Sequence, residues 1–460
     1  MRNELLGRLG DLGDRTAVVE GDTRYSYRDL ASGIERLALT LTSRDVRPHD
    51  VVILNGDFSF LSIATLLALY LNRNIVVPVV TLAEATLATV TQACSPQHLV
   101  RVGDDLTIEG IAAAPPSAPA QSAPPAGYGR LADEGASGLI LLSSGSTAAP
   151  KAILHNLDSI VEAKLGKQAR TGARSSNILM FLLFDHIGGL NSLLGALRIG
   201  ATAIVPKQRT PDEICALIEK HEIRLLPTSP TFLNLVLIGN YHREYDLSSL
   251  RLITYGTEPM PEELLKRINT AFPRARLLQT FGTSETGIST TTSESSRSTY
   301  FKIADDKVRY RIVDGELQLK SDTQFLGYLN YPNDSLTDDS WFRTGDLVEE
   351  STDGYIKIKG RAKEIINVGG EKVLPLELES ILLGSPLIDD CVVYGKPNSI
   401  TGQSVCVDIK PHEEMTRAQL RKHVVDFLSG KVEAFKIPSK VNLIDSVTVS
   451  DRFKKRRIVP

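Results

Sequence analysis

Nine consecutive residues, Ser143 to Lys151, combine the groups that proteins use to hold phosphate. They read Ser-Ser-Gly-Ser-Thr-Ala-Ala-Pro-Lys. Hydroxyl and backbone N–H groups donate hydrogen bonds to anions, glycine allows close approach of the backbone, and lysine adds a mobile positive charge. The apolar run from Leu139 to Leu142 predicts a buried strand that ends in this loop. The stretch therefore predicts a polyphosphate-binding loop, and a Ser/Gly-rich surface turn is the alternative.

Two further loops of small or hydroxylated residues follow predicted strands. Residues 254–257 lie at the end of a strand expected at 252–255, and residues 281–287 follow a strand expected at 276–280. In open α/β sheets, ligands bind outside the carboxyl ends of the strands. We therefore expect these two loops and the Ser143 loop to converge on one crevice.

Two charged segments lie nearer the carboxyl end. In Trp341 to Leu347, the carboxylate of Asp346 follows a glycine and is suited to accept hydrogen bonds from a ribose diol. Residues 360–379 begin Gly-Arg-Ala-Lys-Glu and follow a strand pattern at Tyr355 to Ile358. A turn carboxylate and a surface ion pair are the plain structural alternatives for Asp346 and Arg361.

Strands and helices are expected to alternate along most of the chain, which predicts α/β layers around a mostly parallel sheet. One segment differs, because residues 112–129 are almost entirely Ala, Pro, Ser and Gly and are expected to form a flexible connector. The main expected strands are residues 51–55, 75–80, 178–184 and 202–205, and the main expected helices are residues 58–70, 190–199, 211–220 and 261–272.

Composition sets the class of protein. A chain of 460 residues exceeds the usual size of one core, so at least two domains are expected. A net charge of -3 gives no reason to expect a nucleic-acid partner. Neither a signal peptide nor a membrane-spanning run is recognisable, and the four cysteines lack zinc-site spacing, so a cytoplasmic location is expected.

These motifs, in this order and spacing, resemble those of acyl-adenylate-forming enzymes, the superfamily of acyl-CoA synthetases, nonribosomal peptide adenylation domains and beetle luciferases. The resemblance extends from Tyr25 to Arg457. It implies a large N-terminal domain of layered α/β subdomains, residues 1–360, and a small mobile C-terminal α+β lid domain, residues 361–460. It also implies that ATP and Mg²⁺ activate a carboxylic acid to an acyl adenylate, with release of pyrophosphate. The acyl group then passes to the thiol of CoA or of a carrier-protein phosphopantetheine.

The resemblance assigns roles by matching position. Ser284 would touch the α-phosphate, Glu285 would hold Mg²⁺, and Lys363 would be the hinge about which the lid swings; a helix-start carboxylate and a solvated lysine are the alternatives for the last two. The remaining nucleotide-binding residues are Ser143, Ser144, Gly145, Ser146, Thr147 and Lys151 over the phosphates, Gly256 and Phe281 at the adenine, Thr257, Gly282 and Thr283 in the same loops, and Asp346 and Arg361 at the ribose.

The tail departs from the family pattern. A count from the expected strand at 441–444 places Lys454 on the catalytic lysine and Phe453 where a glycine is usual, whereas a shift of two residues would select Arg452. A solvated basic tail is the third alternative. The phosphate loop also has Ala148 and Ala152 in place of two glycines, which predicts a loop that is either stiffer or less tightly closed on ATP, with slow or weak use of ATP.

The acyl pocket is expected around Phe184-Asp185-His186. By resemblance, His186 would flank the substrate carboxylate, and Phe232 would line an apolar pocket. Asp185 would either bind the ammonium of an amino acid or cap the helix that starts near Ile187. An aryl or fatty acid is the first choice of substrate, and an amino or β-amino acid for a separate carrier protein is the second.

Three functional classes stay open. The chain would be an acid:CoA or acid:carrier-protein ligase, an adenylating enzyme that hands the adenylate to an amine, or a non-catalytic nucleotide or acyl binder. The last is motivated by the missing glycines and by Phe453. No carrier domain with an Asp-Ser attachment motif is recognisable, so the thiol partner is expected to be a separate molecule.

Overall fold

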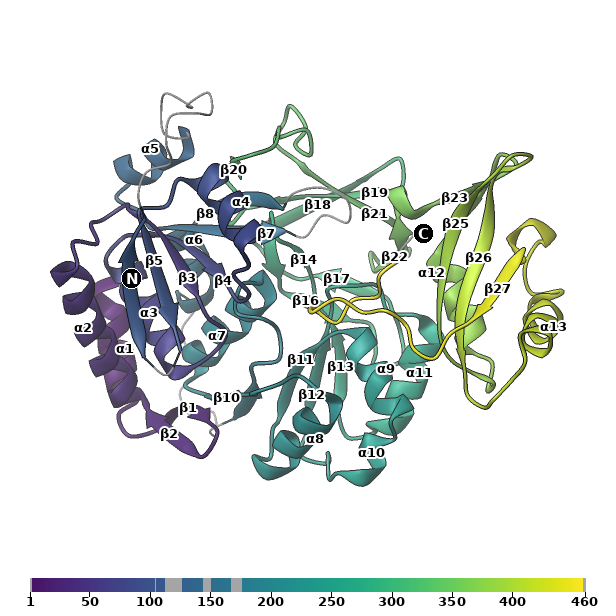
Figure 1. Ribbon diagram of the computed structural model, residues 1–460, viewed down its shortest axis with the longest axis horizontal. Helices are drawn as coiled ribbons and strands as arrows, with labels where there is room; N and C mark the ends of the chain where they lie inside the picture. Colours follow the sequence, from purple (N-terminus) through teal and green to yellow (C-terminus); the bar gives the residue numbers. More distant parts are fainter. Residues whose placement is uncertain (1, 104, 112–125, 144–149, 167–175, 458–460) are drawn as a thin grey trace.

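Two seven-stranded sheets form the centre of the large N-terminal domain (Figure 1). The computed structural model describes residues 2–103, 105–111, 126–143, 150–166 and 176–457. The first sheet has the order β13 (Arg276–Gln279), β12 (Leu252–Tyr255), β11 (Leu225–Thr228), β9 (Asn177–Leu179), β10 (Thr202–Val205), β1 (Thr16–Glu20) and β2 (Thr23–Ser26). The second has the order β20 (Gly327–Tyr328), β8 (Lys151–Asn156), β7 (Gly138–Ser143), β4 (Ile75–Val79), β3 (Val51–Asn55), β5 (His98–Val102) and β6 (Leu106–Gly110).

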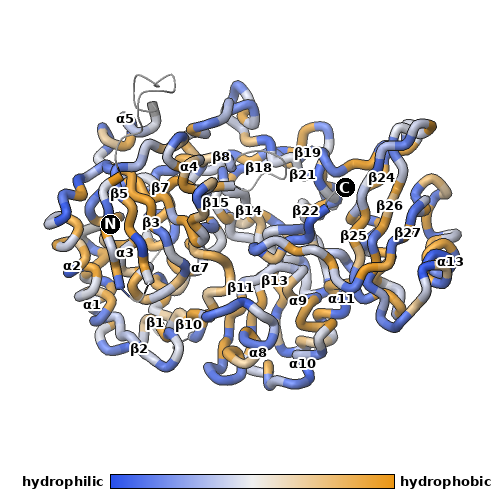
Figure 2. The backbone as a smooth tube through the Cα atoms, in the orientation of Figure 1, coloured by the Kyte–Doolittle hydropathy of each residue, from blue (hydrophilic) through white to orange (hydrophobic). Residues whose placement is uncertain are grey.

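The inner strands of both sheets run parallel, and antiparallel pairs lie toward the edges. This arrangement confirms the predicted α/β class. Parallel strands are covered on both faces, so they are apolar throughout, and the tube in Figure 2 is accordingly orange along β3 and β7. The helices of this domain are α1 (Arg2–Asp11), α2 (Tyr27–Ser43), α3 (Phe60–Leu71), α4 (Glu84–Cys94), α5 (Ala126–Asp133), α6 (Leu157–Leu165), α7 (Ile187–Ile199), α8 (Pro211–Lys220), α9 (Pro230–Ile238), α10 (Tyr241–Glu244) and α11 (Glu262–Ala271).

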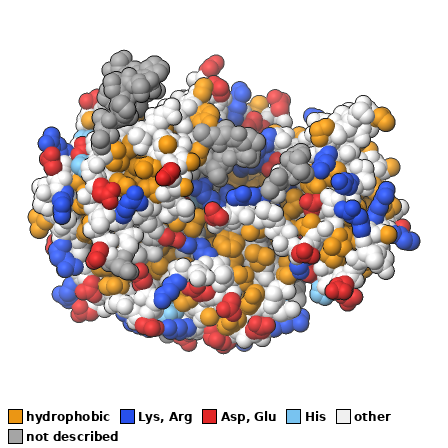
Figure 3. Space-filling view, viewed as in Figure 1, with side chains coloured by type: hydrophobic (Ala, Val, Ile, Leu, Met, Phe, Trp, Pro, Cys, Tyr) orange, Lys and Arg blue, Asp and Glu red, His pale blue; other side chains and the backbone are white. Residues whose placement is uncertain are grey.

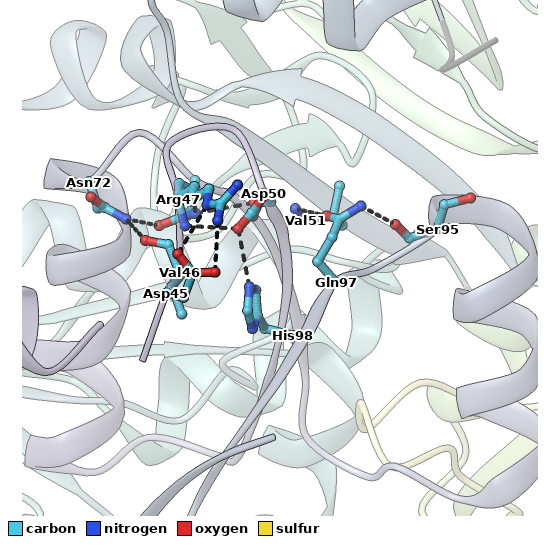
Figure 4. Close-up of polar contacts among 10 residues, drawn as sticks. Asp45, Val46, Arg47, Asp50, Val51, Asn72, Ser95, Gln97 and His98 are labelled. Carbon is cyan, nitrogen blue, oxygen red and sulfur yellow. Dashed lines mark hydrogen bonds and ion pairs between the residues drawn. The ribbon is translucent and has the colours of Figure 1, made fainter. Parts of the chain in front are cut away.

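Polar side chains fasten the amino ends of the strands in the second sheet (Figure 4). The Asp50 carboxylate accepts a hydrogen bond from the Arg47 backbone N–H at 2.8 Å and contacts His98 Nε2 at 3.1 Å. The Gln97 side-chain oxygen accepts from the Val51 backbone N–H at 2.6 Å. Because β3, β4 and β7 are parallel, their carboxyl ends, including Ser143, lie at the opposite edge and are left for loops.

An antiparallel sheet lies beside the two central sheets. Its order is β16 (Thr291–Ser293), β17 (Phe301–Ile303), β22 (Ile356–Arg361), β21 (Phe342–Glu350), β19 (Glu316–Ser321) and β18 (Val308–Val313). A separate hairpin pairs β14 (Phe281–Thr283) with β15 (Gly287–Ser289).

The small C-terminal domain follows β22 and a 3₁₀ turn at Ala362–Glu364, so the predicted boundary at residue 360 falls one residue before that strand ends. Its sheet has the order β24 (Glu371–Val373), β23 (Ile366–Val368), β26 (Gly402–Pro411) and β25 (Ile388–Asn398), with β27 (Lys440–Leu443) paired to β26. Its helices are α12 (Pro375–Leu383) and α13 (Arg417–Leu428), and a 3₁₀ turn spans Ala434–Lys436. The tail then returns from β27 toward the large domain, as the yellow segment in Figure 1 shows.

Two expectations from the sequence need correction. The strand expected at 178–184 is short, since β9 ends at Leu179. The helix expected from residue 190 begins at Ile187, because the His186 side chain accepts a hydrogen bond from the Gly188 N–H and caps it. Among the described residues no helix is long and apolar enough to cross a membrane. Acidic and basic side chains are interspersed on the face in Figure 3.

Two glycines of α7 give a matched stability test. A Cβ at Gly189 would lie 2.0 Å from the Leu183 carbonyl oxygen, whereas a Cβ at Gly195 meets nothing within 4 Å. We expect Gly189→Ala to destabilise the large domain by about 1–3 kcal/mol. Gly195→Ala should be neutral or stabilise it by about 0.5–1 kcal/mol, because alanine loses less entropy in a helix. Urea midpoints measure both, and equal midpoints would contradict this packing.

Candidate active site

A cavity of about 580 Å³ lies where both domains meet the tail. Three of the expected loops contribute to its lining, through Ser143 and Lys151, through Gly256 and Thr257, and through Gly282 to Glu285. From the other side come Thr344, Gly345, Arg361, Lys363, Arg452 and Lys454. The structure thus brings together residues that are more than 300 positions apart in the chain.

The two ends of the predicted phosphate loop lie on neighbouring antiparallel strands, β7 and β8. Ser143 and Lys151 are paired across these two strands. The Lys151 ammonium lies 4.4 Å from the centre of the Tyr328 ring. The positions predicted for Ser144, Gly145, Ser146 and Thr147, and the substituted Ala148, lie outside the described residues.

The turn at 283–286 is shaped by its own hydroxyl group. Thr283 Oγ1 accepts hydrogen bonds from the backbone N–H of Glu285 at 3.2 Å and of Thr286 at 3.1 Å. This turn exposes Ser284 and Glu285 to the cavity. Glu285 Oε1 accepts a hydrogen bond from the Tyr328 hydroxyl at 2.9 Å, and its other oxygen has no partner among the residues that the structure describes.

His155 of β8 holds this turn through a hydrogen bond to its backbone. Its Nε2 donates to the Ser284 carbonyl oxygen at 2.7 Å, and the side chain is fully buried in β8. Burial lowers the pKa of His155 to about 4, so the imidazole is neutral. Neither His155 nor Tyr328 lies in a recognised motif, so the sequence did not predict their roles. The available signal for His155 was a lone polar residue within an apolar strand.

Glycine is required where two loops approach closely. A Cβ at Gly256 would lie 2.5 Å from Thr280 Oγ1, and one at Gly282 would lie 2.2 Å from the Gly287 carbonyl oxygen. Next to Gly256, Thr257 has a left-handed φ of 71°, and its hydroxyl makes no hydrogen bond within the described part of the chain. The Phe281 ring stacks on Phe301 with centroids 5.6 Å apart, in a small core cluster outside the cavity lining.

The two residues predicted at the ribose form an ion pair. Asp346 and Arg361 are register partners in β21 and β22, and Arg361 Nε lies 3.0 Å from Asp346 Oδ1. Only 4% of Asp346 is exposed. Burial raises the pKa of Asp346 to about 6, although Arg361 opposes the shift. Arg361 and Gly345 line the cavity, while the Asp346 carboxylate lies just behind them.

The tail forms a hairpin, residues 449–455, that reaches the large domain. Lys454 donates from its backbone N–H to Ser450 Oγ at 3.2 Å, and its carbonyl accepts from the Ser450 N–H at 2.9 Å. Its ammonium faces the cavity and has no hydrogen bond or ion pair to any described residue. Burial, followed by the nearby Arg452 charge, lowers the pKa of Lys454 to about 8.

Arg452, the alternative to Lys454, already has protein partners. Its guanidinium donates to the Leu142 carbonyl oxygen at 3.1 Å and lies 3.9 Å from Asp185 Oδ1. The Lys454 ammonium, which has no partner in the part of the chain that the structure describes, is available to a ligand anion, whereas the Arg452 guanidinium is held by the large domain. The geometry therefore favours Lys454 for the role of the motif's lysine, which stays a prediction.

Phe453 holds the hairpin in place. Its φ is 51°, the left-handed region that glycine usually occupies. Its ring lies 5.2 Å from Phe181 and 5.5 Å from Phe232, and its carbonyl accepts from Ser229 Oγ at 2.8 Å. Phe453 therefore keeps the backbone geometry of a glycine and adds an aromatic contact to the large domain.

Buried ion pairs fix the rest of the tail. Lys455 Nζ contacts Asp390 Oδ1 at 2.5 Å, and the Lys455 backbone N–H donates to Glu258 of the large domain at 3.2 Å. Arg457 pairs with Glu364 at 3.0 Å and with the buried Glu379 at 2.9 Å. The sequence did not predict these contacts or those of Ser229, because the partners are distant in the chain.

His186 lines the cavity beside the hairpin. Burial, with the nearby Lys454 and Arg452 charges, lowers the pKa of His186 well below its usual range, so the ring is neutral. Its Nδ1 accepts from the Gly188 N–H at 3.1 Å. The proton of a neutral ring therefore lies on Nε2, which can donate to an anion.

Asp185 and Phe232 lie outside the lining of the central cavity, unlike His186 and Lys454. Asp185 Oδ2 accepts from the Val80 N–H at 3.2 Å, and burial raises its pKa. Phe232 is fully buried against Phe181. Neither residue lines the central cavity, and Asp185 does not cap α7. In the described part of the chain, no group of three or more His, Cys, Asp and Glu side chains could hold a metal ion by itself.

Residues 9–329 match the family of AMP-binding enzymes, and residues 377–454 match the AMP-binding enzyme C-terminal domain. The chain therefore belongs to the acyl-adenylate-forming superfamily, as the motifs predicted. The indoleacetate–CoA ligase of Aromatoleum aromaticum is 29% identical over 336 residues, which cover 67% of this chain and 64% of that protein. The match thus spans less than two thirds of that relative.

Two further relatives match almost the whole chain. The 2,3-dihydroxybenzoate-AMP ligase of Bacillus subtilis is 26% identical over 499 aligned positions, which cover 96% of this chain and 89% of that protein. The crystal structure of the anthranilate CoA ligase AuaEII in complex with anthranoyl-AMP superposes with a TM-score of 0.80 at 18% identity. The superposition covers 98% of this chain and 95% of AuaEII. The similarity supports a fold with a large and a small domain.

Two variants of Phe453 test how the hairpin is held. Phe453→Ala loses the ring contacts, worth about 1 kcal/mol each beyond burial, but keeps a left-handed backbone that costs an L-residue about 1–2 kcal/mol. Phe453→Gly also loses the ring contacts, but glycine adopts the left-handed backbone conformation without this steric cost. We expect amide exchange in residues 449–455 to be slowest in the unsubstituted chain, faster with glycine and fastest with alanine. Phe427→Ala on α13 is the control, and exchange unaffected by either Phe453 variant would contradict an anchoring role.

Proposed function

We propose that the chain is an ATP-dependent acid–thiol ligase. It converts a carboxylic acid and ATP to an acyl adenylate and pyrophosphate, then transfers the acyl group to the thiol of CoA or of a separate carrier protein's phosphopantetheine. The observation that carries the proposal is the Lys454 ammonium, which faces a cavity lined by all the nucleotide loops and has no partner among the described residues. A positive charge in such a place is suited to an anionic ligand.

The chemistry needs this charge because two anions must meet. A carboxylate attacks the α-phosphorus of ATP, and the repulsion between them has to be neutralised while the reacting atoms are held in line. Lys454 would bridge the carboxylate and the α-phosphate. The neutral His186 would donate from Nε2 to the carboxylate without adding a second charge.

The nucleotide would be held by residues that already line the cavity. Ser143 and Lys151 would contact the outer phosphates, Ser284 the α-phosphate, and Arg361, held by Asp346, the ribose hydroxyls. Glu285 fits Mg²⁺, because one carboxylate oxygen has no partner among the described residues and Mg²⁺ is commonly bound by one or two carboxylates together with nucleotide phosphates. The ion would neutralise phosphate charge.

The placement of Asp185 bears on the substrate. Its carboxylate lies against Val80 and Arg452 rather than in the cavity, so it offers no partner for a substrate ammonium. This favours an aryl or other acyl acid over an amino acid. The hinge role of Lys363 is consistent with its position in the 3₁₀ turn between the sheets of the two domains.

Pyrophosphate release tests the proposal directly. The purified chain with Mg-ATP is assayed against aryl, fatty, α-amino and β-amino acids, and products formed with CoA are identified by mass. Acid-dependent pyrophosphate release and a CoA thioester are expected. Release without a thioester would restrict the function to adenylation or point to a carrier-protein acceptor. No release with any acid class would favour a non-catalytic binder.

Replacing the lysine should separate the two half-reactions. Lys454→Ala removes the charge between the two anions, and we expect adenylation to fall by on the order of 10²–10³-fold, as for loss of a group that stabilises transition-state charge. Transfer from a preformed acyl adenylate to the thiol should be retained. Lys422→Ala, an exposed lysine of α13, is the control. Unchanged adenylation in Lys454→Ala would exclude this role.

The pH profile should show the same lysine. A lysine is charged below its pKa, so a pKa of about 8 predicts that kcat/KM for adenylation, which reports the free enzyme, declines as the pH rises through about 8. Bound anions raise the pKa of Lys454 in the enzyme–substrate complex. The decline in kcat should therefore begin at a higher pH than the decline in kcat/KM. Lys454→Arg keeps its charge and should lose this alkaline decline in its residual activity. A profile flat to the ordinary lysine pKa of about 10.4 would contradict the assignment.

A further inference from the structure

A second cavity of about 220 Å³ lies next to the central cavity. The two share Ile187, Asn191 and Ile288 in their linings. Ile187 directly follows His186, the residue proposed to contact the substrate carboxylate. An acyl chain that extends past Ile187 therefore leads toward the second cavity.

The walls of the second cavity are apolar in part. Ile160 and Ala163 of α6 form one side, and Val308 of β18 contributes from another. These side chains suit the hydrocarbon body of an acid.

The wall that the two cavities share contains one polar side chain, however. Asn191 lies on α7 at the junction, and its side-chain amide makes no hydrogen bond to any described residue; the oxygen is buried. Leaving a buried amide unpaired against hydrocarbon costs about 1–3 kcal/mol. A ligand with a polar group at this level would satisfy Asn191, whereas an unsubstituted fatty chain would leave it unpaired.

The charges around the second cavity are mainly positive. Of the residues that the structure describes, Lys164, Arg198 and Lys307 line it together with one carboxylate, Asp305. The Asp305 oxygens accept from the backbone N–H groups of Thr290 at 3.0 Å and Lys307 at 3.2 Å. Lys164 Nζ donates to the Ile288 carbonyl oxygen at 3.2 Å, so this lysine is held at the junction.

Arg198 and Lys307 lie at the exposed side of the cavity. Neither has an ion-pair partner within the described residues. Arg198 lies seven positions after Asn191 on α7, about two helical turns along the same face. The helix thus presents first an amide and then a guanidinium along the path of an entering chain.

We propose that the second cavity is the distal end of the acyl pocket, and that it selects a carboxylic acid whose far end carries an anionic group. The inference rests on the proposed ligase function. The carboxylate at one end meets Lys454 and His186, and the anionic group at the other end meets Arg198, Lys307 and Lys164. This selection is narrower than the aryl or fatty acid expected from the sequence, because it requires an anionic group at the far end.

The test compares acids of equal chain length that differ only at the far end. Pyrophosphate release is measured for α,ω-dicarboxylic acids, which carry a second carboxylate, and for the matching monocarboxylic acids. We expect kcat/KM to be roughly tenfold higher or more for the diacid at the best chain length, as a charge-assisted hydrogen bond would give. The difference should weaken at high salt.

Substitutions at the exposed mouth assign the effect to this cavity. Arg198→Gln should reduce the ratio of kcat/KM for the diacid to kcat/KM for the monoacid several-fold, and Arg198→Glu should reverse the preference toward acids with a distal amine. Arg421→Gln, an exposed arginine of α13, is the control for loss of one positive charge. Asn191→Leu should improve turnover of monoacids and diacids alike, because both present hydrocarbon to this position and neither pairs the buried amide.

The outcomes separate the two proposals. Equal turnover of diacids and monoacids, with no effect of Arg198→Gln on their ratio, would overturn the distal anion site while leaving the ligase function standing. No pyrophosphate release with any acid would overturn the ligase function, and the inference with it. A diacid preference that survives both Arg198 substitutions would place the selecting cation elsewhere and overturn this assignment.

Discussion

The active-site geometry depends on one contact, the docking of the tail hairpin, residues 449–455, onto the large domain. The hairpin brings the Lys454 ammonium into a cavity where burial and a neighbouring guanidinium lower its pKa to about 8. Such a charge is unfavourable without a counterion. An anionic ligand in the cavity would supply that counterion, and the proposed binding of nucleotide and acid would thereby depend on the position of the small domain.

The departure from the family's glycine has a physical explanation in this contact. Glycine gives a lysine loop its left-handed turn at no steric cost, whereas Phe453 adopts the same turn as an L-residue. Contacts with Phe181 and Phe232, and the hydrogen bond from Ser229, compensate for the strain. With Phe453 in place of glycine, the loop has less backbone freedom but gains a side chain that packs against the large domain. Packing therefore holds the loop in the observed position.

The rest of the fold serves to bring loops to this contact. Parallel strands fix Ser143 and Gly256 at the carboxyl ends of the two central sheets, and hydrogen bonds at the opposite edge, around Asp50, fasten the strand starts. The helix α7 connects the two halves of the proposed acyl pocket. His186 caps its amino end, where the substrate carboxylate is proposed to bind, and Arg198 lies near its carboxyl end. One rigid helix thus sets the distance between the two ends of the substrate.

The sequence alone determined the α/β class and the strand-end loops, because hydrophobic periodicity and runs of small residues are local signals. It also placed Lys454, through motif spacing, at a position that the structure brings into the cavity. The tertiary structure decided which polar and aromatic groups face that cavity. Asp185 and Phe232 lie outside its lining and His155 supports it from beneath, because the partners that orient each side chain come from segments far away in the chain.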